Sequence, residues 1–133
     1  LDPPALQWFL MLAHRALCPG GILVCETPNT RSLFVLANTF YRDPTHKQPV
    51  HPETYQFMAQ AGGFVDVELR YSLSAPDDRA IKPISTPEGS DASMQVMVRQ
   101  LNQRLRRIDE QVFGYQNVAL IARRPGRASG GQQ

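Results

Sequence analysis

The hydrophobic positions of this chain follow two periods, and together they predict four helices and three strands. Apolar residues spaced three and four apart predict helices over residues 3–17, 32–40, 52–61 and 91–113. Continuous or alternating apolar residues predict strands over residues 22–25, 65–73 and 117–122. Helices alternate with strands in this order, so the predicted fold class is α/β, with at least one parallel strand pair joined through a helical crossover.

The residues between these segments are of the kinds that begin and end regular structure. Asp2-Pro3-Pro4 supplies a capping carboxylate and a proline for the first helix, and Cys18-Pro19-Gly20-Gly21 ends it. Residues 74–90 are rich in proline, aspartate and serine without a usable period, which predicts a loop. One domain is therefore expected over residues 1–124, followed by a disordered polar tail at 125–133.

The most regular pattern lies in the second half of the chain. Its apolar positions follow an unbroken heptad spacing and are Met94, Val98, Leu101, Leu105, Ile108 and Val112. This stripe predicts a long amphipathic helix that packs on its own domain or on a partner helix. A homo-oligomer formed through this helix is therefore one expectation.

Composition and charge change the picture mainly by exclusion. The chain has 14 basic and 12 acidic side chains and a formal charge of +2, and its basic residues are not interleaved with aromatic ones, so we expect no nucleic-acid partner. The two cysteines, Cys18 and Cys25, are too few for a disulfide scaffold or a zinc site, which predicts no metal centre and favours a reducing cytoplasm. No apolar stretch approaches the roughly 20 residues that cross a bilayer, so no membrane span is expected.

Several short motifs occur in a fixed order along the chain. They are Pro19-Gly20-Gly21, Glu26-Thr27-Pro28-Asn29, the segment from Tyr41 to His46, the segment from His51 to Phe57, and Ala61-Gly62-Gly63-Phe64. In this order they resemble the motifs of class I S-adenosylmethionine-dependent methyltransferases. They are most similar to bacterial methyltransferases associated with surface polysaccharide, including the O-antigen chain-terminating type. Residues 101–119 also resemble the end of that group's sequences, so the resemblance covers nearly the whole chain.

This resemblance implies that the chain is the C-terminal half of such an enzyme. Its three strands would be strands 5, 6 and 7 of a Rossmann-like sheet, in the spatial order 5, 7, 6 with strand 7 antiparallel. The half that holds the cofactor, S-adenosylmethionine, would be missing, so cofactor-binding residues are unknown and the chain alone is expected to be inactive. The first residue is Leu1 and not Met, which fits a piece of a longer protein. Without strand 4, the edge of the first strand would be free, giving a second route to a homo-oligomer.

Two glycine pairs in the chain do not replace the missing cofactor loop. Gly20-Gly21 precedes a predicted strand, and Gly62-Gly63 closes a predicted helix. A cofactor loop must instead lead from a strand into a helix, so both pairs are interpreted as turns.

The candidate catalytic residues, His46 and Asp43, lie in the polar segment from Tyr41 to His51. This segment follows the first strand closely, and ligands of open α/β sheets bind beyond the C-terminal ends of parallel strands. Histidine is suited to removing a proton from a hydroxyl acceptor near neutral pH. Asp43 would orient His46 or bind a sugar hydroxyl; alternatively, it only accepts backbone hydrogen bonds in a turn.

The candidate substrate-binding residues are Asn29, Tyr41, Arg42 and His51. Asn29 follows the end of the first strand, and the Arg42 guanidinium is suited to a phosphate or carboxylate group. His51 has an alternative role as the cap of the helix that follows it. Glu26 ends the first strand and is expected to have a partner or to face the site, because an unpaired buried carboxylate is costly.

These features predict a methyltransferase of polysaccharide biosynthesis that uses S-adenosylmethionine to O-methylate a glycan or a related small polar acceptor. The acceptor class follows from the resemblance. The alternative is a non-catalytic binding or assembly module derived from the same fold, in which the helix over residues 91–113 contacts partners.

Overall fold

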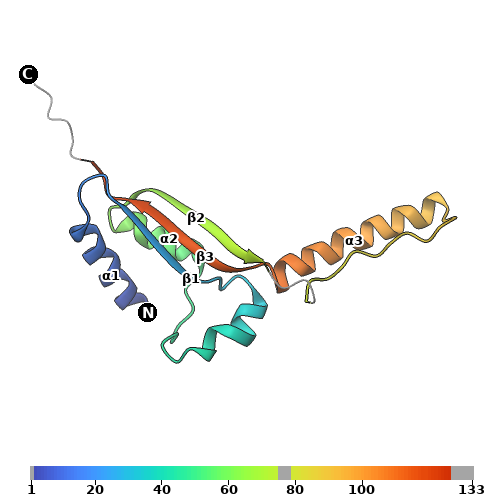
Figure 1. Ribbon diagram of the computed structural model, residues 1–133, viewed down its shortest axis with the longest axis horizontal. Coiled ribbons are helices and arrows are strands. Elements are labelled where there is room, and N and C mark those ends of the chain that lie inside the picture. Colours follow the sequence, from blue (N-terminus) through green and yellow to red (C-terminus); the bar gives the residue numbers. More distant parts are fainter. Residues whose placement is uncertain (1, 75–78, 127–133) are drawn as a thin grey trace, which may run out of the picture.

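The computed structural model describes residues 2–74 and 79–126 and contains a three-stranded sheet with two helices on one face and a third that extends away from it (Figure 1). Its elements are α1 (Pro3–Ala16), β1 (Ile22–Pro28), the π-helical segment η1 (Val35–Thr39), the 3₁₀ turn η2 (Phe40–Arg42), α2 (Pro52–Ala61), β2 (Val65–Ser74), α3 (Ala92–Val112) and β3 (Tyr115–Arg123). The α/β class predicted from the periodicity is therefore observed.

The last strand, β3, lies in the middle of the sheet and pairs antiparallel with both β1 and β2. This central position agrees with the prediction. β1 and β2 run in the same direction and are joined through α2, as predicted, but β3 lies between them, so every hydrogen-bonded pair of strands in the described sheet is antiparallel. The chain leaves β2, runs outward and returns along α3, so it enters β3 with its direction reversed (Figure 1).

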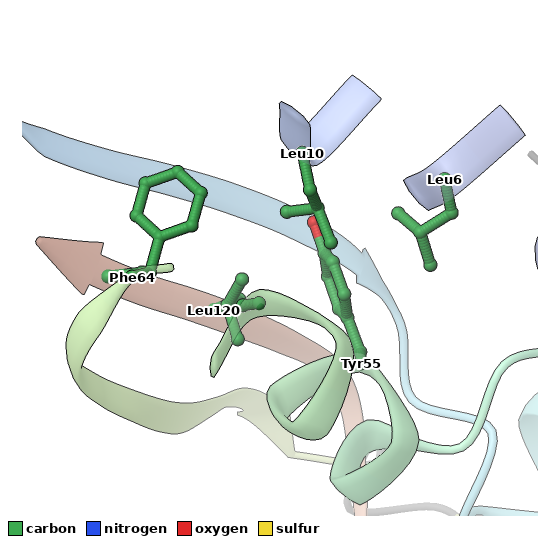
Figure 2. Close-up of a cluster of buried hydrophobic side chains, with 7 residues drawn as sticks. Leu6, Leu10, Tyr55, Phe64 and Leu120 are labelled. Carbon is green, nitrogen blue, oxygen red and sulfur yellow. The ribbon is translucent and has the colours of Figure 1, made fainter. Parts of the chain in front are cut away.

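The hydrophobic core lies between the sheet and the two helices α1 and α2 (Figure 2). Leu6 and Leu10 are four residues apart, so both point from the same side of α1 toward the sheet. Leu120, in the central strand, has 0% of its surface exposed. The buried residues of this cluster are Leu6, Leu10, Tyr55, Ala59, Phe64, Leu120 and Ala122.

The opposite face of the sheet is open in the described part of the chain. Ile22 and Val24 of β1 are 52% and 63% exposed on that face. β1 is also an edge strand, as the free-edge prediction requires. Pairing of this edge with another chain stays a prediction.

The segment predicted as a helix over residues 32–40 is not a regular α-helix. It contains the π-helical η1 and continues into the 3₁₀ turn η2. The Thr39 hydroxyl donates a hydrogen bond to the Val35 carbonyl at 3.1 Å, and the Ser32 hydroxyl accepts one from the Val35 N–H at 3.2 Å. Such side-chain bonds compete with the regular helical pattern, which explains the irregular turns.

The helix predicted over residues 91–113 is present as α3 and extends away from the sheet (Figure 1). An extended segment at residues 79–91, here called the strap, runs beside it and carries no helix or strand. Three α3 side chains at heptad spacing fasten the strap through its backbone. Gln95 Nε2 donates to the Ser90 carbonyl at 3.1 Å, and Asp109 Oδ1 accepts the Ile81 N–H at 2.7 Å. Between them, the Asn102 side-chain amide donates to the Ile84 carbonyl and accepts the Ile84 N–H, both at 2.8 Å.

Parts of two predictions lie outside the described residues. The predicted loop over 74–90 includes residues 75–78, and the predicted disordered tail includes residues 127–133. Among the described helices, none is long and apolar enough to cross a membrane.

Candidate functional site

A cavity of about 380 Å³ lies beside β1, between that strand, α1, α2 and residues 40–50. Apolar side chains form part of its wall, namely Leu6, Phe9, Phe40 and Val50. The remaining lining residues carry groups that can bind or react, namely Cys25, Glu26, Thr27, His46, Gln48 and Tyr55. A mixed lining of this kind is typical of pockets for small ligands, in which a few polar groups fix the ligand's orientation.

The polar segment is held beside the end of β1 at both of its ends. Phe40, the residue before the segment, is buried, with 3% of its surface exposed. Near its other end, the Thr30 hydroxyl donates a hydrogen bond to the Val50 carbonyl at 2.9 Å. The segment is thus fixed at both ends, which positions His46 in the cavity wall.

His46 is held by Phe40 in a defined orientation. Its Nδ1 atom lies 3.1 Å from the Phe40 carbonyl oxygen, and the two rings stack with centroids 5.0 Å apart. A carbonyl oxygen can only accept, so this bond requires the proton on Nδ1. In the neutral ring, Nε2 then carries a lone pair and can accept a proton.

Asp43 lies close to this free nitrogen. Its Oδ2 atom is 3.9 Å from His46 Nε2, while its Oδ1 atom accepts hydrogen bonds from the Thr45 N–H (2.8 Å) and the Thr45 hydroxyl (2.7 Å). The Thr45 side chain and backbone lower the pKa of Asp43, and the charge of His46 contributes further. Asp43 is thus a turn-forming acceptor whose second carboxylate oxygen lies beside the His46 ring.

The predicted substrate-binding residues of the same segment do not line the cavity. Tyr41 is 63% exposed and packs edge-on against Phe40 with centroids 5.0 Å apart. Arg42 is exposed, and neither residue lines the cavity. His51 caps α2 by accepting the Glu53 N–H on its Nδ1 atom at 3.3 Å, which is its alternative role. A substrate contact for any of them stays a prediction.

Asn29 is a buried structural residue in this structure, with 4% of its surface exposed. Its Nδ2 atom donates to the Tyr115 carbonyl at 2.7 Å, and its Oδ1 atom accepts the Arg31 N–H at 3.1 Å. The Nδ2 bond joins the end of β1 to the start of β3, and the Oδ1 bond holds the turn that follows β1. Asn29 does not line the cavity, so the structure gives no support to its predicted role in substrate binding.

Replacing Asn29 with alanine should lower the free energy of unfolding by about 1–3 kcal/mol, because a carbonyl and an N–H would lose their partner in a largely buried place. The matched control is Asn38→Ala, which removes an exposed amide that donates to the Phe34 carbonyl at 3.1 Å. Urea unfolding followed by circular dichroism measures both changes. Equal stability of the two variants would contradict the structural role of Asn29.

The periodicity did not single out Cys25 and Tyr55, which also line the cavity. Burial raises the pKa of the Cys25 thiol, and burial together with the nearby thiol raises the pKa of the Tyr55 hydroxyl. Both groups are therefore neutral near pH 7, and Cys25 is not an activated nucleophile. The sequence could have indicated Cys25, because alternate side chains of a strand point to opposite faces and Cys25 lies on the same face as Leu23, toward the helices.

Glu26 has the partner that was expected for it. Its Oε1 atom accepts a hydrogen bond from Asn117 Nδ2 at 2.7 Å and lies 3.5 Å from the Ser72 hydroxyl. The three residues belong to the three strands, so this contact ties the sheet together at one level. Glu26 is exposed and also lines the cavity.

A larger groove, of about 860 Å³, lies between the strap and α3. None of the predicted site residues lines it. Within residues 2–74 and 79–126, no group of three histidine, cysteine or acidic side chains is arranged to hold a metal ion.

The described residues do not fit a binding site for S-adenosylmethionine. Gly20 and Gly21 lie between α1 and β1, and Gly62 and Gly63 lie between α2 and β2. Neither pair leads from a strand into a helix, the connection that binds a nucleotide-like cofactor. No step of the chemistry is therefore assigned to cofactor contacts in this part of the protein.

Comparison with solved structures places the fold. A SAM-dependent methyltransferase from Archaeoglobus fulgidus matches 92% of this chain with 34% sequence identity and a TM-score of 0.81. The chain spans about half of that protein, 53% of its length. A phosphoethanolamine N-methyltransferase from Haemonchus contortus matches 90% of the chain and 30% of its own length, with 16% identity and a TM-score of 0.46.

No protein-family model and no curated protein matches the chain. The likeness to the Archaeoglobus fulgidus enzyme therefore carries the comparison, because it combines high structural overlap with substantial sequence identity. The described residues thus have the fold of one part of a SAM-dependent methyltransferase.

Proposed function

We propose that this chain is the acceptor-side part of a SAM-dependent methyltransferase that methylates a hydroxyl group of a glycan or a related small polar acceptor. The observation that carries the proposal is His46 in the cavity wall, with Nδ1 bound to a backbone carbonyl and Nε2 left to accept a proton. The likeness to a SAM-dependent methyltransferase supports the reaction class. The motif order from Glu26 to Phe64 supports the polysaccharide-associated group and the O-methylated acceptor.

In this proposal His46 acts as a general base on the acceptor. Its Nε2 atom takes the hydroxyl proton as the acceptor oxygen attacks, and the Asp43 carboxylate, 3.9 Å away, stabilises the resulting imidazolium. The apolar side chains Phe9, Phe40 and Leu6 exclude water from one side of the cavity. When bound, S-adenosylmethionine would supply the methyl group.

The strand correspondence belongs to the same proposal. β1, β2 and β3 are assigned to strands 5, 6 and 7 of the class I sheet, because β3 is antiparallel and lies between the other two. In such a sheet a further strand pairs with the free edge of β1. A cytoplasmic enzyme fits this assignment, since S-adenosylmethionine would be the methyl donor.

The second candidate function is a binding or assembly module without catalysis. It is favoured by one observation, the long helix α3, which extends away from the sheet (Figure 1). Several apolar side chains of this helix are exposed. The two functions are compatible in a larger protein. They differ in whether the cavity at His46 is needed for the protein's activity.

Isothermal titration with S-adenosylmethionine tests whether this chain contributes the acceptor side of the enzyme and not the cofactor site. The 133-residue chain should give no measurable heat of binding, because neither glycine pair among the described residues leads from a strand into a helix. A longer protein containing this chain should bind S-adenosylmethionine and transfer a labelled methyl group to a hydroxyl-bearing glycan. Tight binding by the 133-residue chain alone would contradict the acceptor-side assignment.

A further inference from the structure

One side of α3 carries a line of exposed apolar side chains. Met94, Met97, Leu101 and Ile108 are 44%, 63%, 42% and 49% exposed. Their spacings of three, four and seven residues place them on one face of the helix. The strap packs on the adjacent face, where Val98 is buried to 9% exposure. This line, here called the α3 stripe, is left open by the described part of the chain.

The charges on α3 are not balanced around this stripe. The helix carries four arginines and two acidic residues, Asp109 and Glu110. Both acidic groups are already engaged, Asp109 with the Ile81 N–H at 2.7 Å and Glu110 with Arg106 at 3.4 Å. The arginines without an ion pair among the described residues are Arg99, Arg104 and Arg107.

Arg104 and Arg107 lie where they can meet a partner on the α3 stripe. Arg104 is three residues after Leu101 and four before Ile108, so it belongs to the same side of the helix. Arg107 is one residue before Ile108 and lies about 100° around the helix from it, so its long side chain reaches a partner only at the flank of the stripe. A second copy of this chain would bring the same excess of arginine, whereas a helix with acidic residues beside its apolar positions would neutralise it.

The strap holds α3 in its helical form before any partner binds. The bonds from Gln95, Asn102 and Asp109 recur every seven residues and join α3 to the strap along nearly its whole length. A helix fixed in this way loses little conformational freedom when a partner binds.

We propose that the α3 stripe is a docking surface for an amphipathic helix of another protein, one whose apolar positions are flanked by glutamate or aspartate. The apolar side chains of the two helices would interdigitate, and the acidic flanks would pair with Arg104 and Arg107. The interaction is independent of the cavity at His46, which lies on the sheet side of the molecule.

The test uses the 133-residue chain and two fluorescein-labelled synthetic helical peptides. Both peptides carry leucine at heptad spacing, and they differ only in having glutamate or lysine at the flanking positions. Fluorescence anisotropy measures their binding. The glutamate peptide should bind at least about tenfold more tightly than the lysine peptide, and its affinity should fall with added salt.

Substitutions in α3 locate the site. Leu101→Asp should weaken binding of the glutamate peptide by about tenfold or more, because a charge would enter the apolar contact. Gln103→Asp adds the same charge on the opposite side of the helix and should change the affinity by less than about threefold. The double variant Arg104→Glu, Arg107→Glu should reverse the preference to the lysine peptide. Circular dichroism verifies helix content, and Met97→Asp replaces Leu101→Asp if the latter loses it.

Three results would overturn the proposal. The first is equal affinity for the two peptides or no binding of either one. The second is unchanged binding of the glutamate peptide by both Leu101→Asp and Met97→Asp. The third is a dimer of the unmodified chain in light scattering that Leu101→Asp dissociates, because a second copy would then occupy the α3 stripe.

Discussion

Replacing His46 with alanine in a methyltransferase that contains this chain is expected to lower turnover by about 10²–10⁴-fold, the usual contribution of a positioned general base. The reason is geometric. The Phe40 carbonyl binds Nδ1 at 3.1 Å and the ring stack fixes the imidazole plane, so Nε2 is the nitrogen that would take the acceptor's proton in the proposed mechanism. Alanine removes that acceptor and leaves the cavity otherwise intact. Transfer of a labelled methyl group to the acceptor gives the rate, and titration with S-adenosylmethionine gives the cofactor affinity.

The cofactor affinity of this variant should stay nearly unchanged, because neither glycine pair among the described residues forms a cofactor loop that leads from a strand into a helix. The matched control is Lys47→Ala. Lys47 is the next residue in the same exposed segment, and its side chain does not line the cavity. The control should retain its turnover within about twofold, since exposed substitutions rarely disturb a site. Wild-type turnover in the His46 variant would exclude a base at this position.

Replacing Leu120 with alanine is expected to lower the free energy of unfolding by about 2–5 kcal/mol. Leu120 has 0% of its surface exposed and lies in the central strand, within the cluster that includes Leu10 and Tyr55 (Figure 2). Alanine would lose the burial of the side chain and leave a cavity that these neighbours only partly fill. Urea unfolding followed by circular dichroism measures the difference.

The control for this measurement is Val24→Ala. Val24 is 63% exposed on the sheet face opposite the helices, so its shortening should cost less than about 0.5 kcal/mol. A larger loss for Val24→Ala than for Leu120→Ala would mean that the open face of the sheet is the buried one in solution. That outcome would point to a segment or partner covering β1.

The helices and strands could largely be predicted from local patterns. The stop at Gly20-Gly21, the alternation from Val65 and the heptad stripe each correspond to an element boundary or element in the structure. Their signals are local, because capping groups and side-chain periods act within a few residues. The exception, residues 32–40, follows from hydroxyl groups of Ser32 and Thr39 that bond to the backbone and distort the helix.

The candidate site was predictable only in part. The polar segment indicated His46 and Asp43, and the structure brings them to 3.9 Å of each other. It could not indicate that a backbone carbonyl, that of Phe40, fixes the imidazole, because carbonyl directions are set by the chain path and not by residue type. Asn29 was indistinguishable from a ligand-binding residue in sequence, and its bond to the Tyr115 carbonyl became visible only in the fold. For His51 the sequence already offered the helix cap as an alternative, and the structure shows that bond.

Local spacing and motif order were enough to predict most of the helices and strands and the resemblance to methyltransferases. Which strands are neighbours emerged only in the folded chain. β3 pairs with both β1 and β2, so the two parallel strands do not pair with each other. The fold also decided which polar side chains face the cavity and which form hydrogen bonds with the backbone. These outcomes depend on contacts between residues far apart in the chain, such as Asn29 with Tyr115, and no local period records them.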